Sequence, residues 1–166
     1  MEIERKWLVS DWPVCDFPVV EEYSMRQGYL VVRPTVRIRE EALKGSGTSY
    51  VLCLKSGQGL SRQEIEVSIS REHFEEIAQM IAAPLIPKTR KSYQLPGGLK
   101  LEVNLVDEGQ PTQFMYAEIE FPTVEEAEHF DPAAFGLAKY LDRDVTEDPG
   151  QTMGAYWQAT RWKAPL

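Results

Sequence analysis

The stretch that decides the fold is MEIERKWLV, residues 1–9, at the start of the chain. If this stretch is a β-strand, its side chains alternate between two faces, because successive residues of a strand point in opposite directions. Three charged residues then share one face, namely Glu2, Glu4 and Lys6. For a single strand, the simplest explanation is that such charges point to water. The pattern becomes informative if later strands repeat it.

The chain has 166 residues, of which 43% are hydrophobic. This length and composition predict one independently folded domain spanning 1–166, since no linker-like stretch divides it. No run approaches the roughly 18 apolar residues of a membrane span. Charges also occupy the first residues, where a signal peptide needs an apolar stretch. We therefore predict a cytoplasmic protein without a membrane partner.

Net charge argues against broad polyanion binding. The formal net charge is −8, with 14 Lys and Arg against 13 Asp and Glu in residues 1–100, but 4 against 13 in residues 101–166. Binding to nucleic acid or an anionic membrane relies on a wide positive field. We therefore expect no nucleic-acid partner. Any anionic ligand must be held by a local basic cluster or through metal cations.

Cysteine and histidine provide no catalytic or metal-binding motif. Cys15 and Cys53 lie far apart without a CxxC spacing, which argues against a zinc site and a disulfide framework. His73 and His129 occur in separate amphipathic segments with no convergent motif, so we assign neither a role.

The alternation of the first stretch returns along the chain. Eight segments have strand character: 1–9, 21–32, 35–39, 49–55, 64–69, 86–95, 99–106 and 113–121. Seven of them carry charges on alternate positions. The acidic pairs are Glu2/Glu4, Glu64/Glu66 and Glu118/Glu120, the basic pairs are Arg37/Arg39 and Lys88/Arg90, and the single charges are Lys6, Lys55 and Glu102.

Helical signals are fewer. Ser70 is a suitable N-cap for an amphipathic helix that ends before Pro84, and Thr123 can cap a short helix from Val124. Residues 132–140 suggest a helical turn, and 153–162 suggest a C-terminal helix.

Two arrangements explain the charged strands. In an open antiparallel sheet each charged face is solvated, which is the simpler explanation for any one strand. The repetition favours a mainly β, α+β fold: a closed antiparallel barrel of about eight strands with a charged lumen and helices packed outside. Buried charges must be paired. A long polyanion with divalent cations satisfies both signs of charge, since Lys and Arg pair with phosphate and carboxylates hold hard cations.

In this order, the charged residues resemble those of the CYTH superfamily, the triphosphate tunnel metalloenzymes. The matching elements are Glu2-x-Glu4-x-Lys6, Arg37-x-Arg39, Lys55, Glu64-x-Glu66, Lys88-x-Arg90, Glu102 and Glu118-x-Glu120. The resemblance spans residues 1 to 146 and includes Gln27-Gly28-Tyr29-Leu30 and Asp144-Val145-Thr146. The opening motif alone is weak, whereas the ordered set is specific.

The resemblance implies an eight-stranded tunnel that hydrolyses a triphosphate with Mg²⁺ or Mn²⁺. It implies that phosphate oxygens are bound by Lys6, Arg37, Arg39, Lys55, Lys88 and Arg90. It implies metal binding by Glu2, Glu4, Glu118 and Glu120. The remaining carboxylates, Glu64, Glu66 and Glu102, then support a second metal or orient the attacking water. Such chemistry needs no Ser, Cys or His nucleophile, because the protein supplies mainly positioning and charge stabilisation.

Two residues depart from the family pattern. Asn104 stands where similar members commonly have Asp. Asn retains an oxygen ligand but lacks the negative charge of Asp. Asp144 stands in a segment that resembles the family's Glu-Val-Thr, and the sequence diverges beyond it. For Asn104 the expectation is a weaker second metal site or a changed metal preference, and for the divergent C-terminal part it is a differently closed tunnel.

The leading prediction is a metal-dependent inorganic triphosphatase, a monomer or homodimer, that releases orthophosphate from tripolyphosphate. The superfamily also permits a thiamine triphosphatase or a class IV-type adenylyl cyclase, with Trp7, Tyr29 or Tyr93 stacking on a ring, although these aromatics suit core packing better. A non-catalytic tunnel that binds polyphosphate or a nucleotide is a third possibility, suggested by Asn104.

Overall fold

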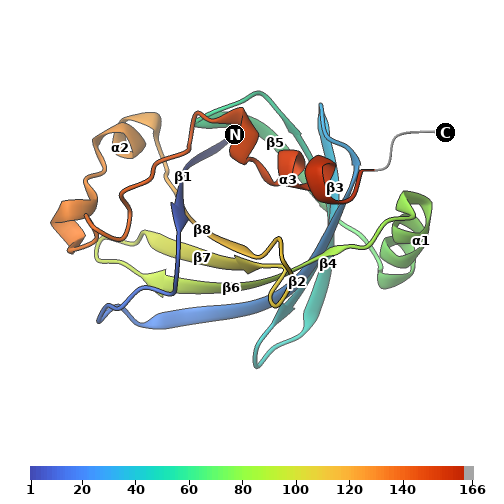
Figure 1. The fold of residues 1–166 in the computed structure, drawn as a ribbon, viewed down its shortest axis with the longest axis horizontal. Helices are drawn as coiled ribbons and strands as arrows, with labels where there is room; N and C mark the ends of the chain where they lie inside the picture. Colours follow the sequence, from blue (N-terminus) through green and yellow to red (C-terminus); the bar gives the residue numbers. More distant parts are fainter. Residues whose placement is uncertain (163–166) are drawn as a thin grey trace.

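A closed barrel forms the centre of the computed structural model, which describes residues 1–162 (Figure 1). Its strands are β1 (Glu2–Val9), β2 (Val19–Val31), β3 (Thr35–Leu43), β4 (Thr48–Ser56), β5 (Ser61–Ser68), β6 (Ile86–Gln94), β7 (Lys100–Val106) and β8 (Phe114–Glu120). They are antiparallel and follow the order β1-β5-β4-β3-β2-β6-β7-β8 around the barrel. The predicted eight-stranded closed barrel is confirmed.

The first strand closes the barrel. β1 pairs with β8 along most of its length, from Glu4 opposite Glu120 to Val9 opposite Met115. Its other edge meets β5 at only two residue pairs, Glu2 with Arg62 and Ile3 with Ser61. The barrel therefore has one short seam, and the acidic start of the chain lies on it.

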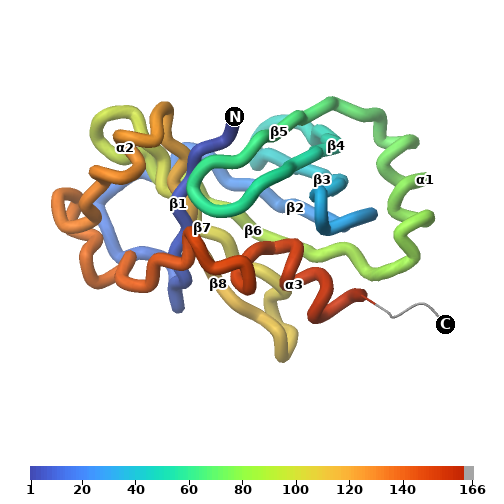
Figure 2. The backbone as a smooth tube through the Cα atoms, turned by 90° about the horizontal axis from the view of Figure 1, so that it is seen from above, coloured from blue at the N-terminus to red at the C-terminus, as the bar shows by residue number. Residues whose placement is uncertain are grey.

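Within residues 1–162, three α-helices and two short 3₁₀ helices flank the barrel. They are α1 (Arg71–Ile81), α2 (Val124–His129), η1 (Pro132–Phe135), η2 (Pro149–Gln151) and α3 (Met153–Thr160). Ser70 caps α1 as predicted, since its hydroxyl accepts a bond from the backbone N–H of His73. Helices α2 and α1 lie at opposite ends of the long axis of the molecule (Figures 1 and 2). Within residues 1–162, no helix has both the length and the apolar character needed to cross a membrane.

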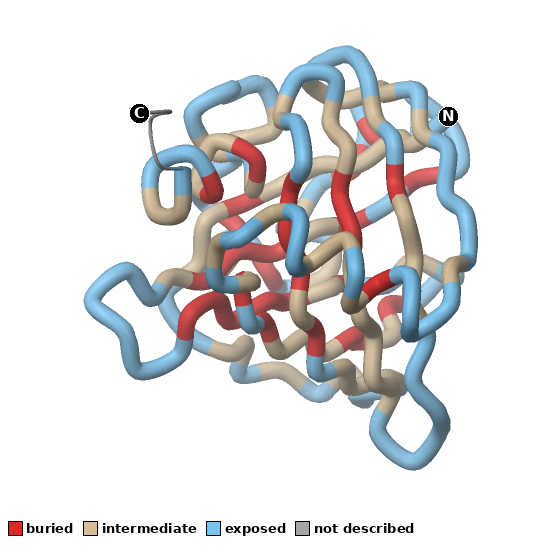
Figure 3. Tube along the Cα trace, turned by 90° about the vertical axis from the view of Figure 1, so that its right-hand side faces the viewer, coloured by how far each residue is buried: buried red, intermediate tan, exposed pale blue. Residues whose placement is uncertain are grey.

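The apolar core has two parts, one on the outer side of the barrel wall and one that reaches the inside of the barrel. One cluster joins Trp7, Ala117 and Ile119 of the wall to α2 and the segment after it. A second joins Tyr29 and Ile86 to Trp157 of α3, together with three further wall residues of β7 and β8. Buried stretches accordingly alternate with less buried ones along the strands (Figure 3). Tyr29 and Tyr116 of the second cluster also line the inside of the barrel, where most other strand residues are polar or charged.

The outer face of β4 and β5 is covered less completely than expected. Leu54 and Ile65 are register partners on this face, and both are exposed, as is Val67. Helix α1 reaches β2, β3 and β4, but it does not cover these side chains. The predicted helical cover therefore extends over only part of the barrel.

Candidate active site

All thirteen predicted site residues line one cavity inside the barrel. The cavity has a volume of about 490 Å³. Strand register brings the side chains together, because opposite residues of antiparallel neighbours share a face. Among the facing pairs are Lys55 with Glu64 and Lys6 with Glu118. The complete set is Glu2, Glu4, Lys6, Arg37, Arg39, Lys55, Glu64, Glu66, Lys88, Arg90, Glu102, Glu118 and Glu120.

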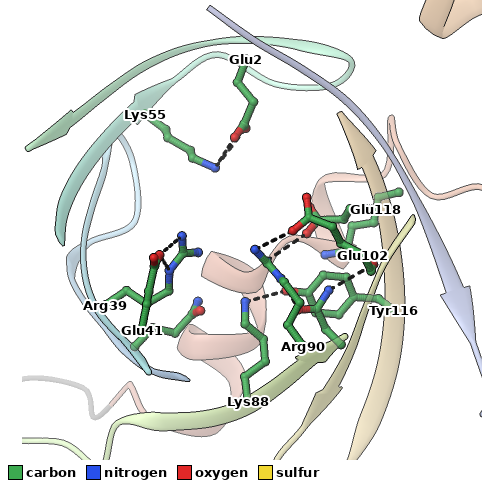
Figure 4. A network of polar contacts seen from close by, with 12 residues as sticks. Glu2, Arg39, Glu41, Lys55, Lys88, Arg90, Glu102, Tyr116 and Glu118 are labelled. Carbon is green, nitrogen blue, oxygen red and sulfur yellow. Dashed lines mark hydrogen bonds and ion pairs between the residues drawn. The ribbon is translucent and has the colours of Figure 1, made fainter. Parts of the chain in front are cut away.

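On one side of the cavity, a lysine is shared by two carboxylates. Lys55 Nζ lies 3.0 Å from Oε1 of Glu2 (Figure 4), and it lies 3.2 Å from Oε2 of Glu64. The three residues come from β4, β1 and β5, so this contact spans the short seam. The carboxylates of Glu2 and Glu64 thus compensate the positive charge of the Lys55 ammonium, which would be costly to bury without a partner.

Across the cavity, Arg90 of β6 organises a second cluster. Its Nη1 lies 2.9 Å from Oε2 of Glu102, and its Nη2 lies 3.7 Å from Oε1 of Glu118. Its Nε donates to Oδ1 of Asn104 at 2.9 Å. Three neighbours therefore fix the guanidinium, each at a different nitrogen. Because the guanidinium is planar, it can make bidentate contacts with phosphate.

Arg39 lies in an intrastrand ion pair. Its Nε donates to Oε1 of Glu41 at 2.6 Å, and its Nη2 lies 4.0 Å from Oε1 of Glu66. Glu41 lies two residues further along β3, so the guanidinium points along the tunnel wall (Figure 4). This predicted phosphate-binding residue is thus held by a carboxylate.

Two lysines meet at the ring of Tyr116. Lys6 Nζ lies 4.2 Å from the ring centroid, and Lys88 Nζ donates to the phenolic oxygen at 2.9 Å. Lys6 Nζ also donates to the carbonyl of Gln151 at 2.5 Å. Burial lowers the pKa of Lys88 well below its ordinary value, and the positive charges of Arg90 and Arg39 act in the same direction.

The C-terminal segment closes part of one mouth of the cavity. Val145 N–H donates to the Lys6 carbonyl at 2.8 Å, and the Lys6 N–H donates to Oγ1 of Thr146 at 3.0 Å. Arg5, on the outer face of β1, pairs with Asp144 at 2.8 Å. These contacts extend the sheet beyond β1 and place residues 145–154 along the cavity lining.

The carboxylates come together in pairs. Burial raises the pKa of Glu2 to about 7, and its contact with Glu64 contributes. Burial also raises the pKa of Glu4 well above its ordinary value, with Glu118 as a contacting neighbour. For Glu118, burial opposes ionisation, but Lys6 and Arg90 outweigh it and lower the pKa to about 2. Contacting carboxylates repel unless a proton or a cation lies between them.

This donor set fits a hard divalent cation that is completed by substrate. Within residues 1–162, no group of three or more acidic, His or Cys side chains forms a preassembled metal cage. Mg²⁺ is ordinarily held by one or two carboxylates together with substrate phosphates and water, rather than by a cage made only of protein groups. The pairs Glu4/Glu118 and Glu2/Glu64 supply such oxygens.

Three residues of the site, of which Arg62 and Tyr116 line the cavity, were missed by the sequence reasoning or given no role. Arg62 lines the cavity, and its buried Nε has no hydrogen-bond partner in the described part of the chain. Tyr116 contacts Lys6 and Lys88, and Glu41 holds Arg39. Each lies two residues from a predicted member of its own strand. Extending the period-two pattern by one step would therefore have found all three.

A closed barrel with this lumen defines a protein of the triphosphate tunnel class, the CYTH superfamily. No protein-family model matches the chain. The inorganic triphosphatase of Nitrosomonas europaea is 38% identical over 147 residues, which cover 89% of this chain and 90% of that protein. The chain therefore belongs to the inorganic triphosphatase family.

Solved structures have the same fold. The crystal structure of an inorganic triphosphatase superposes with a TM-score of 0.61 at 30% identity, covering 94% of this chain and 93% of the other. A putative adenylyl cyclase from Hippeastrum, described as having a dominant triphosphatase activity, gives 0.63 at 17% identity, covering 98% of both chains. At that identity the second likeness concerns the fold alone.

Proposed function

We propose that this protein is a divalent-metal-dependent triphosphatase that converts inorganic tripolyphosphate and water to orthophosphate and pyrophosphate. The observation that carries the proposal is the convergence of all six predicted cationic and all seven predicted acidic side chains in one cavity. A chain of three phosphates matches the cations, and hard cations match the carboxylates. The family relationship to an inorganic triphosphatase supports the same reaction.

In this proposal the cations bind the phosphate chain. Lys6, Arg37, Arg39, Lys55, Lys88 and Arg90 contact its oxygens and neutralise the charge that develops on the leaving pyrophosphate. Arg39 must leave Glu41 to do so, and Lys55 must exchange Glu2 or Glu64 for phosphate. Substrate binding therefore frees carboxylates at the same time as it occupies cations.

The freed and paired carboxylates then complete the site. Glu2, Glu4, Glu118 and Glu120 would hold the cation, which when bound supplies charge neutralisation and orients the phosphate chain. Glu64, Glu66 and Glu102 orient the attacking water and accept its proton. The water oxygen bonds to the terminal phosphorus, and the bond from that phosphorus to the bridging oxygen breaks. Mg²⁺ or Mn²⁺ as the cation, a cytoplasmic location and a monomeric or homodimeric state stay predictions.

The placement of aromatic residues favours an inorganic substrate. Trp7 and Tyr93 belong to the apolar cluster outside the barrel wall, where they cannot stack on a ligand. Tyr29 lines the cavity but packs on Trp157. The face of Tyr116 is approached by Lys6. The thiamine triphosphatase and adenylyl cyclase alternatives therefore lack a free stacking surface among the three predicted aromatics.

A substrate panel tests the proposal. Purified protein with Mg²⁺ or Mn²⁺ is expected to release phosphate from tripolyphosphate faster than from ATP or thiamine triphosphate. Glu4→Gln and Arg39→Ala are the loss-of-activity controls. Faster turnover of an organic triphosphate, or cyclic AMP from ATP, would reject the substrate. Tight binding without phosphate release for every metal would identify a non-catalytic tunnel.

A further inference from the structure

Tyr116 stands between two of the predicted phosphate-binding lysines. It projects from β8, while Lys6 comes from β1 and Lys88 from β6. The ring faces the Lys6 ammonium. The hydroxyl accepts a hydrogen bond from the Lys88 ammonium (Figure 4). Tyr116 is 1% exposed, so both contacts lie in a nearly dry region of the tunnel.

The contact gives Lys88 its hydrogen-bonding partner. Within residues 1–162, the structure shows no other hydrogen bond or ion pair of Lys88 Nζ, and the side chain is buried. The carboxylates near Arg90 are engaged by that guanidinium instead. A buried ammonium without an acceptor would be costly, so the phenol oxygen stabilises the position of Lys88.

The ring acts differently on Lys6. The face of an aromatic ring attracts a cation without taking a hydrogen from it, and this attraction strengthens when water is excluded. Lys6 gives one N–H to Gln151, and Lys88 gives one to Tyr116. Because an ammonium has three donors, each lysine keeps two for a ligand.

The ring is itself held in place from behind. Tyr116 packs in the apolar cluster with Tyr29 and Trp157, and it stacks on Phe114 with centroids 5.8 Å apart. Its orientation is thus set by this apolar cluster. A rigid support of this kind lowers the entropy that two flexible lysines lose on binding.

We propose that Tyr116 is a positioning residue for the triphosphate site, whose hydroxyl fixes Lys88 and whose ring fixes Lys6 before the ligand arrives. The inference rests on the proposed function only in taking tripolyphosphate as the ligand. Affinity for tripolyphosphate then depends on Tyr116 through these two lysines. It does not depend on any direct contact of the phenol with phosphate.

Calorimetric titration with tripolyphosphate in EDTA tests this without turnover. Tyr116→Phe is expected to raise the Kd roughly tenfold, the effect of losing a hydrogen bond to a charged group. Tyr116→Leu should raise it roughly fivefold further, because the ring is lost as well. Tyr93→Phe, a buried tyrosine outside the tunnel, is the matched control and should leave the Kd unchanged.

Double variants separate positioning from general structure. In a Lys88→Met background, Tyr116→Phe should change the Kd by less than about twofold, because the residue through which it acts is missing. In a Lys6→Met background, Tyr116→Phe and Tyr116→Leu should differ little. Equal penalties with and without the lysines would overturn the inference, as would an unchanged Kd for Tyr116→Phe. Phosphate release with metal is measured separately, so its failure would reject the proposed reaction while the metal-free Kd values still decide the role of Tyr116.

Discussion

The side-chain oxygen of Asn104 accepts a hydrogen bond from Nε of Arg90, at 2.9 Å, and Asn104 is fully buried. The sequence pattern suggested that this residue replaces a negatively charged metal ligand. In the structure its oxygen is engaged by a guanidinium whose other nitrogens face Glu102 and Glu118. A neutral amide orients Arg90 without cancelling more of its charge.

Replacing this amide by a carboxylate tests that relationship. Asn104→Asp is expected to raise the KM for tripolyphosphate at least roughly tenfold, because a new negative charge would neutralise Arg90 and repel phosphate. Steady-state phosphate release measures it. Gln63→Glu, which adds the same charge at an exposed position of β5, is the control. Higher turnover together with tighter metal binding in Asn104→Asp would instead support a metal-ligand role.

Glu41 competes with the substrate for Arg39. Removing its charge in Glu41→Gln should free the Arg39 guanidinium for phosphate. We expect the KM for tripolyphosphate to fall by about threefold, which corresponds to part of the free energy of a partly exposed ion pair. The adjacent Glu40 pairs with Arg26 on the other face of β3, so Glu40→Gln is a matched control. A KM that rises in Glu41→Gln would mean that the carboxylate holds Arg39 in its productive position.

Glu4 is proposed as a metal ligand from the middle of β1. Glu4→Gln keeps the shape of the side chain but weakens cation binding, and we expect phosphate release to fall by about 100-fold or more. Titrations with Mg²⁺ and Mn²⁺ should show a higher metal requirement. Glu125→Gln, on exposed α2, should behave like the wild type. Full activity of Glu4→Gln at ordinary metal concentrations would remove Glu4 from the metal site.

The anchor of α3 should make stability depend on pH. Asp107 is buried and forms an ion pair with Arg161, which together with bonds from Tyr156 and Thr112 lowers its pKa below 3.8 in spite of burial. The pKa of Asp107 is lower in the folded protein than in the unfolded chain. The ion pair therefore stabilises the fold fully at pH values above the unfolded-state pKa, and this stabilisation is lost as the pH falls through the folded-state pKa. Asp107→Asn should cost about 2 kcal/mol at pH 7.

Thermal unfolding at several pH values checks this difference. The gap in Tm between wild type and Asp107→Asn should be constant from pH 7 to about 5, and should narrow as the pH falls below about 4. The other carboxylates become protonated in both proteins, so their effect on Tm cancels in the difference. A gap that is independent of pH down to about 2 would show that the carboxylate charge is not what anchors the helix.

The strand pattern could be predicted from the sequence because each strand has one charged and one apolar face. The alternation in β1 predicted that Glu2, Glu4 and Lys6 share a face, and the closed barrel places that face in the lumen. Helix α1 was predictable from its cap at Ser70 and its spacing. The spacing of apolar residues is sufficient to predict such elements, because it shows which face of a strand or helix is buried.

The pairing within the site could not be predicted from periodicity. It depends on register across strands, which places Lys55 beside both Glu2 and Glu64, and on the path of the C-terminal segment, which brings Gln151 to Lys6. Tyr116 was overlooked because an aromatic in a strand is expected to face the apolar side. Its hydroxyl and ring are useful in the lumen only because two lysines from other strands meet there.

The short contact between β1 and β5 has a consequence for motion. Two facing pairs and one additional bond, from Glu4 N–H to the Leu60 carbonyl, join these strands, whereas β2 and β6 are paired along eight positions. The amide proton of Glu4, at the short seam, should therefore exchange with solvent faster than those between β2 and β6. Tripolyphosphate and a divalent cation would slow this exchange by bridging Glu4 and its neighbours, so hydrogen exchange along one strand would report directly on occupancy of the tunnel.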